Sequence, residues 1–147
     1  MIPAEFNGID HVVLQVSDMS RSLAFYVDVL GLSLERVLET IGLHQVRCGR
    51  NLIDLVPLNP SEQLAGPEQR GLEHLCLSVR GDIDEIVKAL QASGIEIISG
   101  PVEVYGASGY GTSVYVRDPD GYTIEIKVHY AKRPVHHGSA PKVTATV

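Results

Sequence analysis

The sequence predicts an α+β fold made of two βαβββ modules. The first observation is an internal repeat, since residues 8–16 (GIDHVVLQV) match residues 71–79 (GLEHLCLSV) with the glycine, the acid, the histidine and the final valine in register. The second is a later match between residues 51–55 (NLIDL) and residues 122–126 (YTIEI). The third is the same order of strand and helix patterns in both copies, as expected of a duplicated unit.

The first copy reads as a strand, a helix and three further strands. Apolar and polar residues alternate over 9–16, as in a half-buried strand. Asp18 is a candidate N-cap of the following helix, and Gly31 is placed to end it. One apolar stripe on this helix contains Leu23, Tyr26, Val27 and Leu30. Strands are expected near 34–39, 43–48 and 51–56.

The second copy repeats this order. Alternation covers 72–79, Asp82 with Glu85 forms a capping box, and Gly94 ends the helix. The apolar stripe of this helix contains Ile83, Ile86, Val87 and Leu90. Strands are expected near 95–99, 112–117 and 122–128, with a DPDG turn at 118–121. A glycine-containing loop at 105–111 holds the extra residues of this copy. It either closes over a pocket or is an ordinary flexible hairpin connection.

Residues 1–130 are predicted to form a single domain, with modules at about 7–58 and 71–129. Residues 59–70 are polar and contain two prolines and a glycine, as expected of a linker. Residues 131–147 have no periodicity and are predicted to be a flexible tail.

The composition is that of a soluble globular protein, with 44% hydrophobic and 20% charged residues. A net charge of -6 without a basic cluster argues against nucleic acid and anionic membrane as partners. No apolar run is long enough to span a bilayer. Cys48 and Cys76 do not make a disulfide framework. We therefore expect a cytoplasmic protein with reduced thiols that acts on a small molecule.

Strand alternation places two histidines and two carboxylates opposite the faces that pack on the helices. His11 and His74 occupy equivalent positions in the first strands, and Asp54 and Glu125 do so in the last strands. A single strand histidine is more often structural, and a single carboxylate is usually solvated. Two equivalent pairs, on sheets that face each other, instead indicate one divalent metal: Zn, Ni, Mn, Co or Fe.

The polar face of the last strand, which holds Thr123, Glu125 and Lys127, is expected to be wet or to line a site. Cys76 lies on the same side as His74, and we expect a small buried thiol there. His129, at the end of this strand, is expected to be solvated.

Four motifs resemble the vicinal oxygen chelate superfamily, which includes glyoxalase I, extradiol dioxygenases, fosfomycin resistance enzymes and bleomycin-binding proteins. They are GIDH at 8–11, SLAFY leading to LGL within 22–32, GLEH at 71–74 and YVRDPDGYTIE at 115–125. The resemblance covers roughly residues 7–129 and is nearest to uncharacterised glyoxalase-domain proteins. It implies curved mixed sheets that form an open cleft, as in glyoxalase and dihydroxybiphenyl dioxygenase.

The resemblance implies that His11, His74 and Glu125 are metal ligands. Asp54 occupies the position of a fourth ligand, which is a glutamate in glyoxalase I. Because aspartate is one methylene shorter, the resemblance leaves three roles for Asp54: it binds the metal directly, binds it through a water, or acts as a base beside it. Glu125 and Asp54 are candidates for proton transfer. Tyr115 either donates a hydrogen bond to substrate or is a packed aromatic. The resemblance also implies a homodimer whose sites are shared between chains.

The branches of the superfamily differ in substrate residues. Glyoxalase-I-like lyase or isomerase chemistry, on a substrate that chelates through adjacent oxygens, is the first expectation. Gln15 stands where that branch has a glutathione-binding arginine, whereas Arg36 resembles its substrate-side arginine. An extradiol dioxygenase is the second expectation, although 105–110 lacks its acid-base histidine. A fosfomycin-type thiol transferase and a non-catalytic small-molecule-binding resistance protein remain alternatives, the latter disfavoured by the intact ligand positions.

Overall fold

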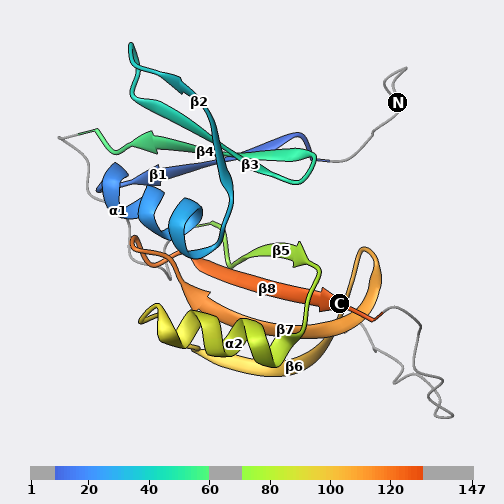
Figure 1. The fold of residues 1–147 in the computed structure, drawn as a ribbon. Helices are drawn as coiled ribbons and strands as arrows, with labels where there is room; N and C mark the ends of the chain where they lie inside the picture. Colours follow the sequence, from blue (N-terminus) through green and yellow to red (C-terminus); the bar gives the residue numbers. More distant parts are fainter. Residues whose placement is uncertain (1–8, 60–70, 131–147) are drawn as a thin grey trace, which may run out of the picture.

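The computed structural model describes residues 9–59, the first module, and residues 71–130, the second module. Each module contains one four-stranded sheet (Figure 1). In both sheets the first strand pairs in parallel with the last, and the other neighbours are antiparallel. The predicted α+β fold of two βαβββ modules is therefore confirmed, and the two mixed sheets leave an open cleft rather than a closed barrel.

The first module has the sheet order β1-β4-β3-β2. Its elements are β1 (His11–Val16), α1 (Met19–Leu23), a π-helical continuation η1 (Ala24–Val29), β2 (Ser33–Leu38), β3 (Leu43–Cys48) and β4 (Asn51–Pro57). Asp18 caps α1 as predicted, because its side chain accepts a hydrogen bond from the Arg21 amide at 3.0 Å. Gly31, with φ +73°, reverses the chain after η1.

The second module has the equivalent order β5-β8-β7-β6. Its elements are β5 (Leu75–Val79), α2 (Ile83–Ala92), β6 (Ser99–Gly106), β7 (Gly109–Arg117) and β8 (Thr123–His129). Asp82 caps α2 by accepting hydrogen bonds from the amides of Asp84 and Glu85 at 2.9 and 3.2 Å. The same element order, caps and strand pairings recur in both modules, so the repeat seen in the sequence is a structural repeat.

Alternation along the strands separates a packed face from a polar face in both modules. Leu14 and Val16 of β1 and Leu77 of β5 are buried, whereas His11 and Cys76 are exposed. The buried apolar side chains form one cluster across the modules: Leu14, Val16, Phe25, Tyr26, Val46, Ile53, Leu55, Leu77, Leu90, Val114, Val116, Tyr122, Ile124 and Ile126. Burial of this cluster is the main stabilising term and fixes which strand faces remain available for a site.

Polar contacts also join the two modules at the DPDG turn. The Tyr26 hydroxyl donates to the Asp118 carboxylate at 2.9 Å, and both side chains are buried. The Ser17 amide donates to Asp120 at 3.0 Å. Burial raises the pKa of the Asp118 carboxyl, while the Tyr26 hydrogen bond opposes that rise. The helix of the first module is thus tied to the last hairpin of the second.

We expect Tyr26→Phe to lower the free energy of unfolding by about 1.5–3 kcal/mol at neutral pH, because a buried carboxylate oxygen loses its donor. Because the pKa of Asp118 is raised in the folded state, its ionisation costs stability as pH rises through that pKa. The difference in unfolding free energy between the variant and the unmodified protein should therefore shrink at acid pH, where Asp118 is protonated. Urea denaturation at both pH values measures this. Tyr105→Phe is the matched control, since Tyr105 is 73% exposed; equal unfolding midpoints for both variants at neutral pH would contradict the assignment.

The predicted loop at 105–111 is wrong, because these residues are largely strand. β6 and β7 form a long hairpin in which Gly106 pairs with Gly109, leaving only residues 107 and 108 at the tip. The predicted strand at 95–99 is also displaced, since β6 begins at Ser99. The glycines of this segment are typical of loops, yet Gly111 lies within β7. A Cβ atom at this position would stand 2.3 Å from the Val128 carbonyl oxygen. They allow close backbone approach within a sheet.

The division into one domain of residues 1–130 and a tail at 131–147 stays a prediction. Residues 60–70 of the predicted linker, and the whole predicted tail, lie outside the described residues. Within 9–59 and 71–130, no helix combines the length and apolar character needed to cross a membrane.

Candidate metal site

The second module brings two of the predicted ligands into contact. His74 immediately precedes β5, which runs parallel to β8, where Cys76 is the register partner of Glu125. This pairing places the His74 Nε2 atom 3.1 Å from Oε2 of Glu125. The Glu125 side chain is buried, and its other oxygen, Oε1, accepts a hydrogen bond from the Ser113 hydroxyl at 2.6 Å. The carboxylate is therefore held in one orientation, facing the imidazole.

Tyr115 completes this group of side chains. It is the register partner of Glu125 on β7, and its ring meets the His74 imidazole edge to face at a centroid distance of 5.8 Å. Burial, followed by the nearby Glu125 charge, raises the pKa of the Tyr115 hydroxyl. A hydroxyl that keeps its proton is a hydrogen-bond donor beside the carboxylate.

The first module holds the equivalent pair on the equivalent strands. Asp54 of β4 is the register partner of Val13, which places it on the same face of the sheet as His11. The Gln45 side-chain amide donates to both Asp54 oxygens, at 3.1 and 3.2 Å, and thereby orients them. Arg36 of β2 is in register with Gln45, so it also lies on the Asp54 side of the sheet.

Each histidine is fixed by the acid that precedes it. The Nδ1 atom of His11 contacts the Asp10 carboxylate at 2.7 Å, and Nδ1 of His74 contacts the Glu73 carboxylate. The hydrogen bond to Asp10 raises the pKa of His11, with a smaller contribution from Asp54. A proton held on Nδ1 by a carboxylate leaves Nε2 with its lone pair, which is the form of histidine that binds metal.

The two pairs do not meet within one chain. Among the residues of 9–59 and 71–130, no three His, Cys, Asp or Glu side chains lie close enough together to hold a metal ion. The structure therefore contains two half-sites, His11 with Asp54 and His74 with Glu125. The exposed apolar side chains of Ile9 and Val13, 72% and 55% exposed, lie beside the first half-site.

The residues present fit a divalent metal. Imidazole nitrogens and carboxylate oxygens bind Zn²⁺ and similar ions at about 2.0–2.2 Å, so two such ligands on one ion lie about 3 Å apart. The separation of 3.1 Å between His74 and Glu125 agrees with this. The hydrogen bonds from Ser113 and to Glu73 are of the kind that orients metal ligands.

Sequence reasoning missed the residues that orient the carboxylates, and it misjudged the exposure of Cys76 and His129. Ser113 and Gln45 face Glu125 and Asp54 across a strand pair, which strand alternation could have indicated once the register was known. Cys76 is exposed rather than a small buried thiol, and partial burial together with Glu125 raises the pKa of its thiol to about 11.

The polar face of β8 is not wet, because Glu125 and Lys127 are 5% and 2% exposed. His129 is half-buried rather than solvated. The burial of Lys127 arises because the β6–β7 hairpin covers this side chain, as the contacts of the hairpin glycines with it indicate.

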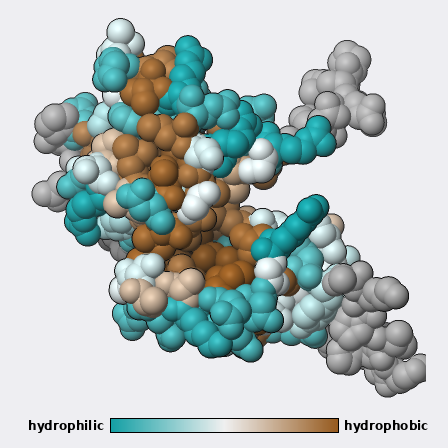
Figure 2. Space-filling model, in the orientation of Figure 1, coloured by the Kyte–Doolittle hydropathy of each residue, from teal (hydrophilic) through white to brown (hydrophobic). Residues whose placement is uncertain are grey.

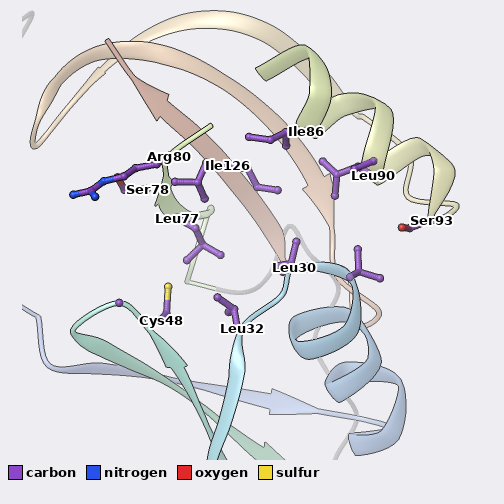
Figure 3. Close-up of a pocket in the computed structure, with 14 residues that line it drawn as sticks. Leu30, Leu32, Cys48, Leu77, Ser78, Arg80, Ile86, Leu90, Ser93 and Ile126 are labelled. Atoms are coloured by element: carbon purple, nitrogen blue, oxygen red, sulfur yellow. The ribbon is translucent and has the colours of Figure 1, made fainter. Parts of the chain in front are cut away.

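Two hollows lie between the modules. An apolar cavity of about 400 Å³ is lined by side chains such as Leu30, Leu77 and Ile126 on the helix side of the sheets (Figure 3). The apolar surface between the two modules in Figure 2 lies over this region. A larger open cleft of about 1230 Å³ contains Asp10, Cys76 and Ser108 among its lining residues. None of His11, Asp54, His74 and Glu125 lines either hollow, but their neighbours Asp10 and Cys76 line the larger cleft.

The sequence profile of the Glyoxalase/Bleomycin resistance protein/Dioxygenase superfamily matches residues 8–126. The chain belongs to this superfamily. Virulence protein STM3117 of Salmonella typhimurium is 36% identical over 123 residues, covering 80% of this chain and 81% of that protein. The crystal structure of STM3117 superposes with a TM-score of 0.71 at 34% identity and covers 86% of this chain and all of that one.

Two other superfamily members have names that state an activity. Glutathione transferase FosA of Serratia marcescens is 27% identical over 122 residues, covering 82% of this chain and 80% of that protein. The structure of lactoylglutathione lyase from Agrobacterium tumefaciens matches with a TM-score of 0.62 at 26% identity, covering 85% of this chain and 96% of that one. The superfamily thus includes enzymes, while STM3117, the more similar relative, has a name that states no reaction.

Proposed function

We propose that this protein is a divalent-metal-dependent enzyme that binds a small substrate through adjacent oxygen atoms. The observation that supports it most is the oriented pair of His74 and Glu125, in which each side chain is held by a hydrogen bond at its other polar atom, Nδ1 of His74 and Oε1 of Glu125. Among the described residues, His74 is the one basic residue within ion-pair distance of the Glu125 carboxylate. A buried carboxylate with so little neutralising charge is well suited to bind a cation.

The metal would be held by His11, His74 and Glu125, with Asp54 as a fourth ligand or as a base beside it. Because the two half-sites lie apart in one chain, we propose that the first module of one chain meets the second module of another. Exposed Val13 and Ile9 would then be covered in a homodimer with two shared sites. The ion is one of Zn, Ni, Mn, Co or Fe, which these ligand types accommodate.

A bound metal of this kind supplies a Lewis acid that stabilises negative charge on a substrate oxygen. The protein side chains supply the rest. Asp54, held by Gln45, is placed to take or return a proton. Tyr115, which keeps its proton, is placed to donate a hydrogen bond to a substrate oxygen next to Glu125.

Glyoxalase-I-like lyase or isomerase chemistry is the reaction we propose first. Arg36 lies in register with Gln45 on the Asp54 side of the sheet, where it can meet the substrate, and lactoylglutathione lyase is a structural relative. Thiol transfer is a second candidate, because the FosA relative is a glutathione transferase. Extradiol oxygenation ranks below these, since 105–110 has no histidine. A cytoplasmic location also remains a proposal.

Elemental analysis of untagged protein, joined to a panel assay, tests this proposal. The panel contains methylglyoxal with a series of thiols, catechol under oxygen, and fosfomycin with the same thiols. We expect about one divalent ion per chain and turnover of the hemithioacetal. Less than about 0.2 ion per chain, with no turnover in any assay, would contradict an enzyme and favour a protein that only sequesters its ligand.

We expect Ser113→Ala to weaken metal binding by about 10- to 100-fold, because Glu125 loses the hydrogen bond that orients it. Competition with a chromogenic chelator measures the affinity. Ser33→Ala, at an exposed position of β2, is the matched control and should leave it unchanged. Equal affinities for the two variants would show that Ser113 does not orient a ligand.

A further inference from the structure

Beyond Glu125, strand β8 carries a cation that the proposed metal site does not use. Lys127 follows Glu125 by two residues, so both side chains lie on the same face, roughly 7 Å apart along the strand. The Lys127 residue is only 2% exposed. A buried ammonium group is costly unless a negative group or several acceptors surround it.

The protein itself gives this ammonium little compensation. Its Nζ atom donates one hydrogen bond, to the Gly109 carbonyl oxygen at 3.0 Å. Among the described residues, the ion pairs join other groups, and no carboxylate lies within ion-pair distance of Lys127. An ammonium has three donors, so two of them have no acceptor among residues 9–59 and 71–130.

The hairpin above Lys127 is built to make room for this side chain. A Cβ atom at Gly106 would lie 2.7 Å from the Lys127 Nζ atom, and one at Gly111 would lie 3.0 Å from Cε. Real Cβ atoms do not approach as closely as 2.7 Å, so a larger residue at Gly106 would displace the ammonium, whereas Gly111 is required chiefly by the Val128 carbonyl oxygen. The glycines and the lysine form one arrangement that keeps a positive charge beside the site.

A second polar group on this face lacks a partner. His129 follows Lys127 by two residues, and its Nδ1 atom is buried without a hydrogen-bond partner in the part of the chain that the structure describes. An unsatisfied buried nitrogen is unusual in a folded protein, because it loses its bond to water. Glu125, Lys127 and His129 therefore form a row on β8 in which Lys127 has one acceptor and His129 Nδ1 has no partner among the described residues.

The open cleft runs along β5, the strand that pairs with β8, although Glu125, Lys127 and His129 themselves do not line it. Its lining residues include Cys76 and Ser78 of β5 and Ser108 at the hairpin tip. Ser78 is the register partner of Lys127, as Cys76 is of Glu125. For a ligand in the cleft to reach Lys127, the start of β7 would have to move aside, because the Gly109 carbonyl oxygen accepts the hydrogen bond from Nζ.

We propose that Lys127, with His129, forms a subsite for an anionic group of the substrate. The substrate class is then a small molecule with two adjacent oxygens at one end and a carboxylate, phosphate or phosphonate at the other. The anionic group replaces the Gly109 carbonyl as the acceptor of Lys127. This inference rests on the proposed metal site, because Glu125 sets where the chelating end lies.

Matched ligands test the subsite by binding rather than by turnover. Glycerate and 3-phosphoglycerate share the 2-hydroxycarboxylate that chelates a metal and differ in a terminal phosphate; lactate and malate differ in a terminal carboxylate. Calorimetry on the metal-loaded protein gives the four affinities. We expect at least one anionic ligand to bind about 10- to 100-fold more tightly than its partner.

Lys127→Met should abolish most of that preference while leaving glycerate and lactate binding within about twofold. Lys88→Met, which removes the same charge at an exposed helix position, should keep the preference. No preference in the unmodified protein, or an undiminished preference in Lys127→Met, would overturn the subsite. The comparison of ligands on the unmodified protein does not require that the variant fold.

Metal content measured on the same samples separates the two proposals. Protein that takes up metal and binds both members of each pair equally contradicts the anionic subsite alone. Protein that takes up no metal contradicts the proposed function and this inference with it.

Discussion

His74→Ala is expected to reduce metal affinity by at least about 1000-fold, a larger loss than removal of an orienting residue causes. The side chain contributes one of three proposed protein ligands, and its Nε2 atom faces the Glu125 carboxylate. Removal also leaves Oε2 of the buried carboxylate without the imidazole that faces it, so an ion bound there has one protein ligand fewer. Chelator competition and elemental analysis measure the loss.

His44→Ala is the control for this variant. His44 also lies on a strand and is partly buried, but its Nδ1 atom contacts the Gly42 carbonyl oxygen at 3.0 Å and it belongs to neither half-site. We expect its metal affinity to match that of the unmodified protein. A His74→Ala variant that keeps full metal content would contradict the ligand assignment.

The second large effect is complementation between two inactive chains. Neither His11→Ala nor His74→Ala should bind metal alone. If each site combines the first module of one chain with the second module of another, a mixed dimer has one intact site and one doubly damaged site. Random pairing of equal amounts makes half the dimers mixed, so about a quarter of all sites should recover metal.

The control mixture combines His74→Ala with Glu125→Ala, both of which lie in the second half-site. Every site in that mixture carries at least one damaged ligand, so no recovery is expected. Refolding the chains together ensures that they exchange. Recovery near zero in the first mixture, with dimers present, would show that a site is built within one chain.

Much of this arrangement follows from the sequence. The repeat of GIDH and GLEH predicted equivalent first strands, and alternation then placed His11 and Asp54, as well as His74 and Glu125, on the faces opposite the core. These predictions succeed because the side-chain period of a strand is fixed at two and the core face must be apolar. The capped helices were also confirmed at Asp18 and Asp82.

The separation of the half-sites could not be predicted in this way. Alternation assigns a face within one sheet, whereas the relation between the sheets depends on long-range contacts such as the bond from Tyr26 to Asp118. Similarly, the burial of Lys127 depends on the curl of the β6–β7 hairpin, and the glycines that permit it look like loop residues in the sequence. These features emerge only when distant segments pack.

Native mass spectrometry of the untagged, metal-loaded protein tests the shared site most directly, because it reports subunit number and bound ions in the same particle. Our account predicts a dimer that carries two divalent ions, and a monomer released at higher collision energy that carries none. A monomer that retains one tightly bound ion, or a dimer that stays metal-free in excess zinc or nickel, would contradict it.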